Sequence, residues 1–221
     1  MLKTYRQIRK DEVFCVGCDL SVGCGDWTVA QFFSVTSMDV PLVWATQESG
    51  TALTNWLWSF AGKLSDITGT KPLIAYERNN GGAFEMDRLA SLNREAKYEI
   101  YTAPVIGEGE NSNDSRSDKL GWDTNTVTRP EMLSNMKTML EDKIVRIYDK
   151  STIEELFSFI VNRHSNSLKA EAEKNAHDDR VMALAIALKI SQLYPLDKLR
   201  GGDYSKQLRK YYSNYDKVSG Y

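Results

Sequence analysis

The sequence predicts an α/β fold in which a mixed β-sheet is covered by helices. Three observations support this: apolar stretches near the N-terminus have the composition of strands, helical and strand-like segments then alternate, and the last apolar segment is a helix. Consecutive strands followed by alternating helices and strands are typical of a sheet that combines antiparallel and parallel pairs.

The first third of the chain predicts a run of strands. Each is short, rich in β-branched and aromatic residues, and bounded by Gly or Pro; they are residues 13–20, 28–35 and 42–47. Between the first two, residues 23–26 predict a hairpin turn, because Gly23 and Gly25 accept positive φ.

Helices and strands alternate after this run. Apolar residues at helical spacing predict a helix over residues 52–67, which Gly69 ends. The apolar run at residues 72–77 predicts a buried strand, followed by a helix through about residue 95 and a strand at 98–105.

In the second half of the chain, capping signals predict where helices begin. Thr128 with Glu131, and Ser151 with Glu154, have the spacing of capping boxes and predict helices through about residues 141 and 163. A short strand is expected between them at residues 143–149. Residues 181–188 are all apolar, so the helix over 177–194 should be buried on most sides.

The composition indicates one soluble domain with short extensions. The chain has 221 residues with a formal charge of −2, and no apolar run approaches the ~20 residues of a membrane span. The start has no apolar signal-peptide core, which favours a cytosolic setting. We assign residues 1–12 to a linker remnant, 13–195 to the folded domain, and 196–221 to a basic, tyrosine-rich tail. Residues 107–118 contain no apolar side chain and predict a loop.

The cysteines predict core packing and no metal site. Cys15 and Cys18 lie in a predicted strand, where positions three apart point to opposite faces. With Cys24 they make an odd number of thiols, and no second Cys pair completes a zinc site. A Walker A motif is also absent, so ATP hydrolysis is not assigned to this chain.

Carboxylates stand at the ends of three predicted apolar elements: Asp19, Glu77, and the pair Asp178 and Asp179. Each one alone is an ordinary strand-end or helix-cap residue. Gathered at one sheet edge, they would raise one another's pKa unless a cation neutralised them. Oxygen ligands without histidine or thiolate suit Mg²⁺ or Mn²⁺, and two such ions support phosphodiester hydrolysis.

Four stretches of the chain resemble the nuclease domain of a tailed-bacteriophage terminase large subunit. They are "CDLSVGCGDWT", "IAYERNNGGAF", "LGWDTNTVTRPEMLSNMKTML" and "HDDRVMALAIAL", in this order over about residues 15–190. The resemblance implies a ribonuclease H-like mixed central β-sheet flanked by helices. It also implies a metal-dependent DNA endonuclease that cuts concatemeric viral DNA during genome packaging in the host cell cytoplasm.

The resemblance implies roles for individual residues. The catalytic metal ligands would be Asp19, Glu77, Asp178 and Asp179, holding two Mg²⁺ or Mn²⁺ ions. Supporting roles fall to Asp26, Asn79 and His177. Candidates for contacts with DNA phosphates are Arg78, Lys119, Arg129 and Lys137.

The implied partners are double-stranded DNA, the portal protein, the small terminase subunit and an ATPase domain of the same protein, with no membrane. Two alternatives remain open at this point. One is a Holliday-junction resolvase or transposase-like nuclease of the same fold, and the other is a non-catalytic DNA-binding or assembly module.

Overall fold

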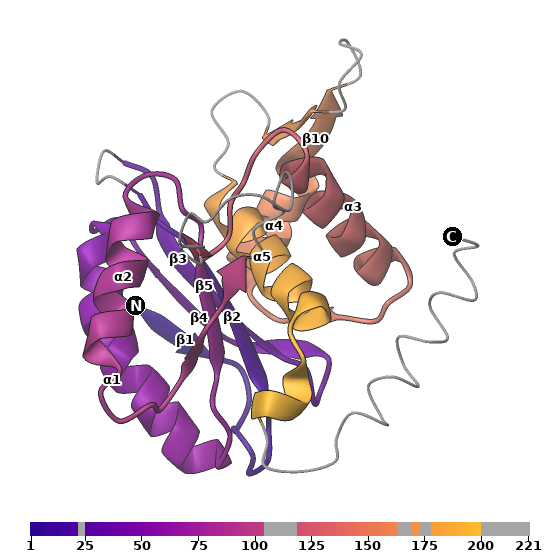
Figure 1. The fold of residues 1–221 in the computed structure, drawn as a ribbon. Helices are drawn as coiled ribbons and strands as arrows, with labels where there is room; N and C mark the ends of the chain where they lie inside the picture. Colours follow the sequence, from indigo (N-terminus) through magenta and orange to yellow (C-terminus); the bar gives the residue numbers. More distant parts are fainter. Residues whose placement is uncertain (22–24, 104–118, 163–168, 173–177, 200–221) are drawn as a thin grey trace, which may run out of the picture.

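A central mixed sheet organises the chain. The computed structural model describes residues 1–21, 25–103, 119–162, 169–172 and 178–199 (Figure 1). Within these residues the sheet has the strand order β1-β4-β3-β2-β5-β6, and β9 also pairs with β4. Its strands are β1 (Leu2–Thr4), β2 (Phe14–Asp19), β3 (Thr28–Ser34), β4 (Asp39–Thr46), β5 (Leu73–Tyr76), β6 (Glu99–Ile100) and β9 (Arg146–Ile147).

The direction of the strands follows from how they are connected. Short connections make β2, β3 and β4 antiparallel, whereas β5 runs parallel to β2 because helix α1 carries the chain back across the sheet. Strand β6 is parallel to β5. The predicted mixed sheet is therefore confirmed.

Helices cover both faces of the sheet (Figure 1). Helices α1 and α2 lie on one face, and α5 lies on the other with α3 and α4 packed against it. The helices are α1 (Gly50–Thr68), α2 (Gly82–Leu92), α3 (Thr128–Glu141), α4 (Lys150–Ser158) and α5 (Asp179–Leu193), followed by the 3-10 turn η1 (Leu196–Leu199).

The sheet separates two apolar cores. Because side chains alternate along β2, Cys15 packs with α5 and α3, whereas Cys18 packs with α1 and α2. Burial raises the pKa of both thiols, which favours their neutral form. The predicted role of these two cysteines as core residues is confirmed, while Cys24 lies outside the described residues.

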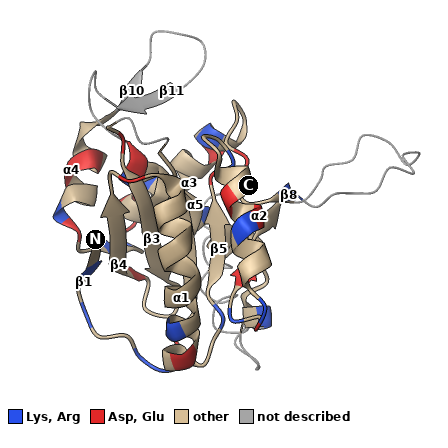
Figure 2. Cartoon of the chain, turned by 90° about the vertical axis from the view of Figure 1, so that its left-hand side faces the viewer, with Lys and Arg blue, Asp and Glu red and all other residues tan. Residues whose placement is uncertain are grey.

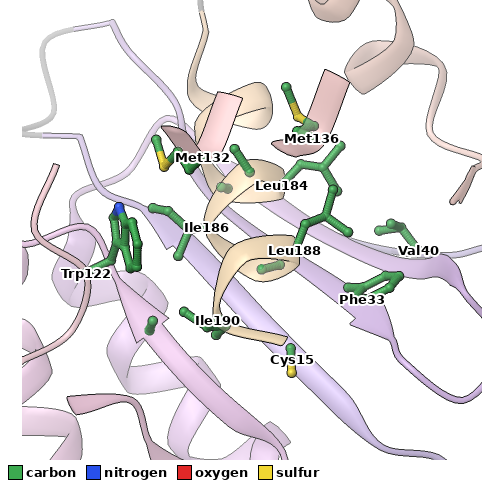
Figure 3. Packing of buried hydrophobic residues seen from close by; sticks show 14 of the residues in the cluster. Cys15, Phe33, Val40, Trp122, Met132, Met136, Leu184, Ile186, Leu188 and Ile190 are labelled. Atoms are coloured by element: carbon green, nitrogen blue, oxygen red, sulfur yellow. The ribbon is translucent and has the colours of Figure 1, made fainter. Parts of the chain in front are cut away.

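Helix α5 lies directly on the central strand. A Cβ atom placed on Gly17 of β2 would lie 2.1 Å from the carbonyl oxygen of Ala183 and 2.4 Å from the nitrogen of Ala187. The missing side chain therefore lets the two backbones touch. Around this contact, Leu184 and Leu188 of α5 pack toward Phe33 and Val40, and α3 closes the far side with its methionines (Figure 3).

The helix predicted from Thr128 through about residue 141 is confirmed as α3, and α4 is present near Ser151, but neither predicted capping box forms. Thr128 is the first residue of α3, and Asn125 accepts hydrogen bonds from the backbone N–H groups of Val127 and Thr128. Helix α4 begins two residues earlier than its box implies, because Asp149 accepts from the N–H of Thr152. In both cases an Asx side chain upstream reaches the free N–H groups first.

Several predicted boundaries also move. Helix α2 ends at Leu92 and α4 at Ser158, where the chain enters strand β10 (Phe159–Asn162), which pairs with β11 (Lys169–Ala172). The strand expected at residues 98–105 is divided between β6 and β7 (Thr102–Ala103), and β7 pairs with β8 (Lys119–Leu120).

The ends of the chain differ in what is described. Within residues 1–12, β1 pairs with β4 along the sheet edge. At the other end, Leu196 and Leu199 of η1 are buried in the core beneath α5, and residues 200–221 lie outside the described part, as does the expected loop at 107–118. The connection of the N-terminal segment to another domain stays a prediction.

Figure 2 views the molecule from the side of α1. In this view Lys and Arg lie next to Asp and Glu on α2 and on α4 at the edge, while the middle of α1 carries neither. None of the described helices combines the length and apolarity of a membrane-spanning segment.

Candidate metal centre

Asp19 and Glu77 are neighbours at one edge of the sheet. Strands β2 and β5 are parallel with Cys18 opposite Tyr76, and the N–H of Glu77 donates to the carbonyl of Cys18 at 2.8 Å. The next residue on each strand is therefore a carboxylate. Both side chains are only 7 % exposed, because α5 and the turn after β5 enclose them.

The N-terminus of α5 delivers the second pair of carboxylates to the same edge. Asp178 is the N-cap of this helix and Asp179 is its first residue. The close approach of α5 to Gly17 fixes how far along β2 these two residues lie. Oδ2 of Asp179 accepts from the backbone N–H of Trp27 at 3.1 Å, and Oδ2 of Asp178 lies 2.8 Å from Nη2 of Arg129.

One open cleft joins these residues. Its volume is about 660 Å³, and it is lined by Asp19, Asp26, Glu77, Asn79, Asn80, Arg129, Asp178, Asp179 and Met182. The four carboxylates that the sequence predicts as metal ligands therefore share one cleft, together with the predicted supporting residues Asp26 and Asn79. His177 lies outside the described residues.

Asn79 supports Glu77. Its Nδ2 atom donates to Oε1 of Glu77 at 3.2 Å and approaches the carbonyl of Thr124 at 3.4 Å. The amide thus links the carboxylate at the end of β5 to the segment that leads into α3. The supporting role of Asn79 in a metal site stays a prediction.

The electrostatics of the cleft disfavour a charged Asp19. Burial raises the pKa of Asp19 well above its usual range, and the nearby carboxylates of Glu77, Asp179 and Asp178 raise it further. Asp19 also shares a hydrogen bond with Glu77, which a protonated carboxyl can donate. This is the mutual repulsion that the sequence predicted for carboxylates gathered at one sheet edge.

The carboxylates are held apart by separate partners. Across the described residues, no three or more His, Cys, Asp or Glu side chains are already arranged to hold a metal ion. Asp178 is turned to Arg129 and Asp179 to the N–H of Trp27. An ion that all four carboxylates coordinate would require at least one of these contacts to change.

Of the four cations proposed to contact DNA, Arg129 alone is part of the described cleft lining. Arg78 donates to the carbonyl of Leu120 at 2.5 Å and so holds the segment beside β5. Lys119 is exposed on β8. Lys137 lies in an exposed ion pair with Glu141.

Residues that the sequence did not single out hold Asp179 in place. Trp27 donates its N–H to Asp179, and its ring lies 4.5 Å from the guanidinium carbon of Arg180. Arg180 in turn pairs with Glu155 of α4 at 2.5 Å, with both side chains almost fully buried. The only signal in the sequence was that Trp27 and Arg180 each follow an aspartate of the candidate set.

Solved structures match this arrangement of strands and helices. The large terminase nuclease from thermophilic phage G20c with bound magnesium superposes with a TM-score of 0.60 at 18 % identity, covering 85 % of this chain and 86 % of that one. The chain has the fold of the large terminase nuclease domains. The ribonuclease H-like class predicted from the sequence is therefore confirmed.

Other terminase nuclease domains superpose in the same way. The domain from Thermus phage P74-26 gives a TM-score of 0.56 at 19 % identity over 85 % of this chain and 83 % of that one. The Mn-soaked human cytomegalovirus domain gives 0.51 at 12 % identity over 84 % and 90 %. The G20c nuclease was also solved with cobalt and with zinc. No protein-family model and no curated protein matches the chain in sequence.

Proposed function

We propose that the chain is a divalent-metal-dependent DNA endonuclease that cuts viral DNA during genome packaging. The observation that carries this proposal is the meeting of Asp19, Glu77, Asp178 and Asp179, from three elements, in one cleft. The terminase nuclease fold supports it, since terminase nuclease domains from two phages and from human cytomegalovirus superpose on the chain.

The donor set of the cleft fits Mg²⁺ or Mn²⁺. All candidate ligands are carboxylate oxygens, which hard divalent cations prefer. The raised pKa of Asp19 means that its charged form lacks a counter-charge, which a cation would supply. Asp19 and Glu77 would hold an ion between β2 and β5, and Asp178 and Asp179 would complete a site for two ions.

Divalent ions bound there would supply Lewis-acid stabilisation of the charge that develops on a phosphodiester during hydrolysis. The chain itself supplies orientation. Asn79 fixes the carboxylate of Glu77, and the N–H of Trp27 fixes that of Asp179. The pairing of β2 with β5 and the hydrogen bond from the N–H of Glu77 to the carbonyl of Cys18 hold the backbones of Asp19 and Glu77 side by side.

The substrate and partners follow from the same proposal. The cleft is open, which suits a polymer that enters from the side. Double-stranded DNA is the proposed substrate, with Arg129 closest to the carboxylates and Arg78, Lys119 and Lys137 as further candidate contacts. The packaging role adds the portal protein, the small terminase subunit and a packaging ATPase domain as proposed partners inside the host cell.

The test is plasmid cleavage by the full chain with Mn²⁺ or Mg²⁺. We expect wild type to nick and linearise supercoiled DNA, and EDTA to abolish this. Asp19→Asn and Glu77→Gln should each lower the rate at least about 100-fold. Asp66→Asn is the matched control, because Asp66 is exposed and pairs with Lys97 away from the cleft.

Three outcomes would contradict the proposal. Binding of DNA without cleavage in either metal would favour a non-catalytic assembly module. Preferential cutting of four-way junctions over linear duplex would favour a resolvase. Full activity of Asp19→Asn would remove the assignment of the metal centre.

A further inference from the structure

Arg129 places a positive charge inside the proposed metal centre. Its Nη2 atom lies 2.8 Å from Oδ2 of Asp178, and each side chain is 32 % exposed. Arg129 comes from the first turn of α3 and Asp178 from the N-cap of α5, so the pair joins two helices. Among the described residues that line the cleft there are five carboxylates and this single guanidinium.

We propose that Arg129 competes with divalent cations for Asp178 and leaves Asp178 for a DNA phosphate, so that substrate binding completes the metal centre. This inference rests on the proposed nuclease function. The guanidinium of Arg129 and a divalent ion are both attracted to the negative charge of Asp178. If the guanidinium stays beside a bound ion, the two positive charges repel each other. In the absence of DNA, Arg129 therefore weakens ion binding.

When DNA binds, Arg129 would give up its contact with Asp178 and contact a DNA phosphate instead. The planar guanidinium donates two parallel hydrogen bonds to phosphate as readily as to carboxylate. Water screens an ion pair that is one third exposed. Exchanging Asp178 for a phosphate therefore costs Arg129 little interaction energy. Because linkage is reciprocal, bound DNA then raises the affinity for the ion, and the ion raises the affinity for DNA.

If Arg129 only oriented Asp178, replacing Arg129 would have the opposite effect on the affinity for metal. Partners that orient a ligand carboxylate raise the affinity for metal, so their loss weakens binding. If Arg129 is a competitor, its loss strengthens binding. The sign of the change in metal affinity, measured without DNA, therefore separates the two roles.

The experiment is calorimetric titration of the full chain with MnCl₂ in the absence of DNA. We expect Arg129→Gln to bind Mn²⁺ about tenfold more tightly than wild type, which is 1.4 kcal/mol. Lys97→Gln is the matched control, because it removes one positive charge from an exposed ion pair outside the cleft and should change nothing. Arg129→Lys keeps the charge and should stay within about twofold of wild type.

A second variant and a second readout complete the test. In an Asp178→Asn background, Arg129→Gln should raise Mn²⁺ affinity by clearly less than tenfold, because competition for Asp178 is gone and only the repulsion between the guanidinium and the ion remains. In EDTA, Arg129→Gln should weaken binding of a short duplex. The slope of the logarithm of the binding constant against the logarithm of salt concentration should fall by about one, which corresponds to one lost phosphate contact.

An unchanged or weaker Mn²⁺ affinity of Arg129→Gln would overturn the competition, as would an unchanged salt dependence of DNA binding. These results leave the nuclease proposal intact as long as wild type cleaves plasmid DNA in Mn²⁺ or Mg²⁺. If wild type cleaves no DNA in either metal, the nuclease proposal falls, and the competition falls with it.

Discussion

The contact between β2 and α5 leads to a sharp prediction at Gly17. An alanine there would place its Cβ 2.1 Å from the carbonyl oxygen of Ala183, whereas ordinary contacts begin at 3.4 Å. Helix α5 would have to move away by roughly 1.3 Å, because the opposing atoms belong to its backbone and have no rotamer to change. Overpacking of this kind lowers the free energy of unfolding by about 1–3 kcal/mol. Because the neighbouring atoms are rigid, we expect Gly17→Ala to lie near the upper end, at about 3 kcal/mol.

The same displacement affects the candidate site. Asp178 and Asp179 are attached to α5, so they would move relative to Asp19 on β2. A shift of about 1 Å in a catalytic group lowers rates about 100-fold, so the variant should lose cleavage even where it remains folded.

Urea unfolding followed by tryptophan fluorescence measures the free-energy cost. Gly62→Ala is the matched control, because a Cβ at Gly62 in α1 meets nothing within 4 Å. Removing a glycine from a helix interior should stabilise the protein by up to about 1 kcal/mol, the opposite sign. A Gly17→Ala variant within 0.5 kcal/mol of wild type, a threshold of about half the smallest expected cost, would refute the close approach of α5.

Three further predictions concern buried charges. Burial opposes ionisation of Asp149, but its hydrogen bonds outweigh burial and lower the pKa to about 2, so Asp149→Asn should cost about 2 kcal/mol at pH 7. In urea unfolding, this deficit should shrink as the pH falls from about 4 toward 2, where the native carboxyl is itself protonated. Asp19→Asn should raise the melting temperature in EDTA at pH 8, and the gain should decline toward pH 4, because burial followed by Glu77 raises the pKa of Asp19. Arg180→Met should cost about 3–5 kcal/mol by leaving Glu155 buried and unpaired, and adding Glu155→Gln should recover about half in a double-mutant cycle.

Local sequence patterns predicted the elements that make up the sheet and its two helical layers. The helix that ends at Gly69, the strand before Glu77 and the apolar helix after Asp179 appear within a few residues of their expected ends. These elements are identified by periodicity and composition, which are properties of adjacent residues. The expected caps did not form at the starts of α3 and α4 because Asn125 and Asp149 accept from N–H groups nearer the start of each helix than those the capping boxes would have bound.

The candidate site was predicted in part for the same reason. A carboxylate at the end of an apolar strand or the start of an apolar helix is visible in the sequence, so Asp19, Glu77, Asp178 and Asp179 were predicted, and the structure places all four in one cleft. The contacts of Trp27 and Arg180 were not, because a backbone N–H and a buried guanidinium carry no distinctive pattern.

The sequence by itself determined which of the main segments are strands and helices and which of them carry an acidic residue at one end. Only the tertiary structure decided that these ends meet. The parallel register of β2 with β5 sets Asp19 beside Glu77, and the bare backbone of Gly17 admits α5 close enough to bring Asp179 to them. It also placed Arg129, a candidate DNA contact, in an ion pair with Asp178. Register and helix approach depend on pairings between residues far apart in the chain, which no local pattern records.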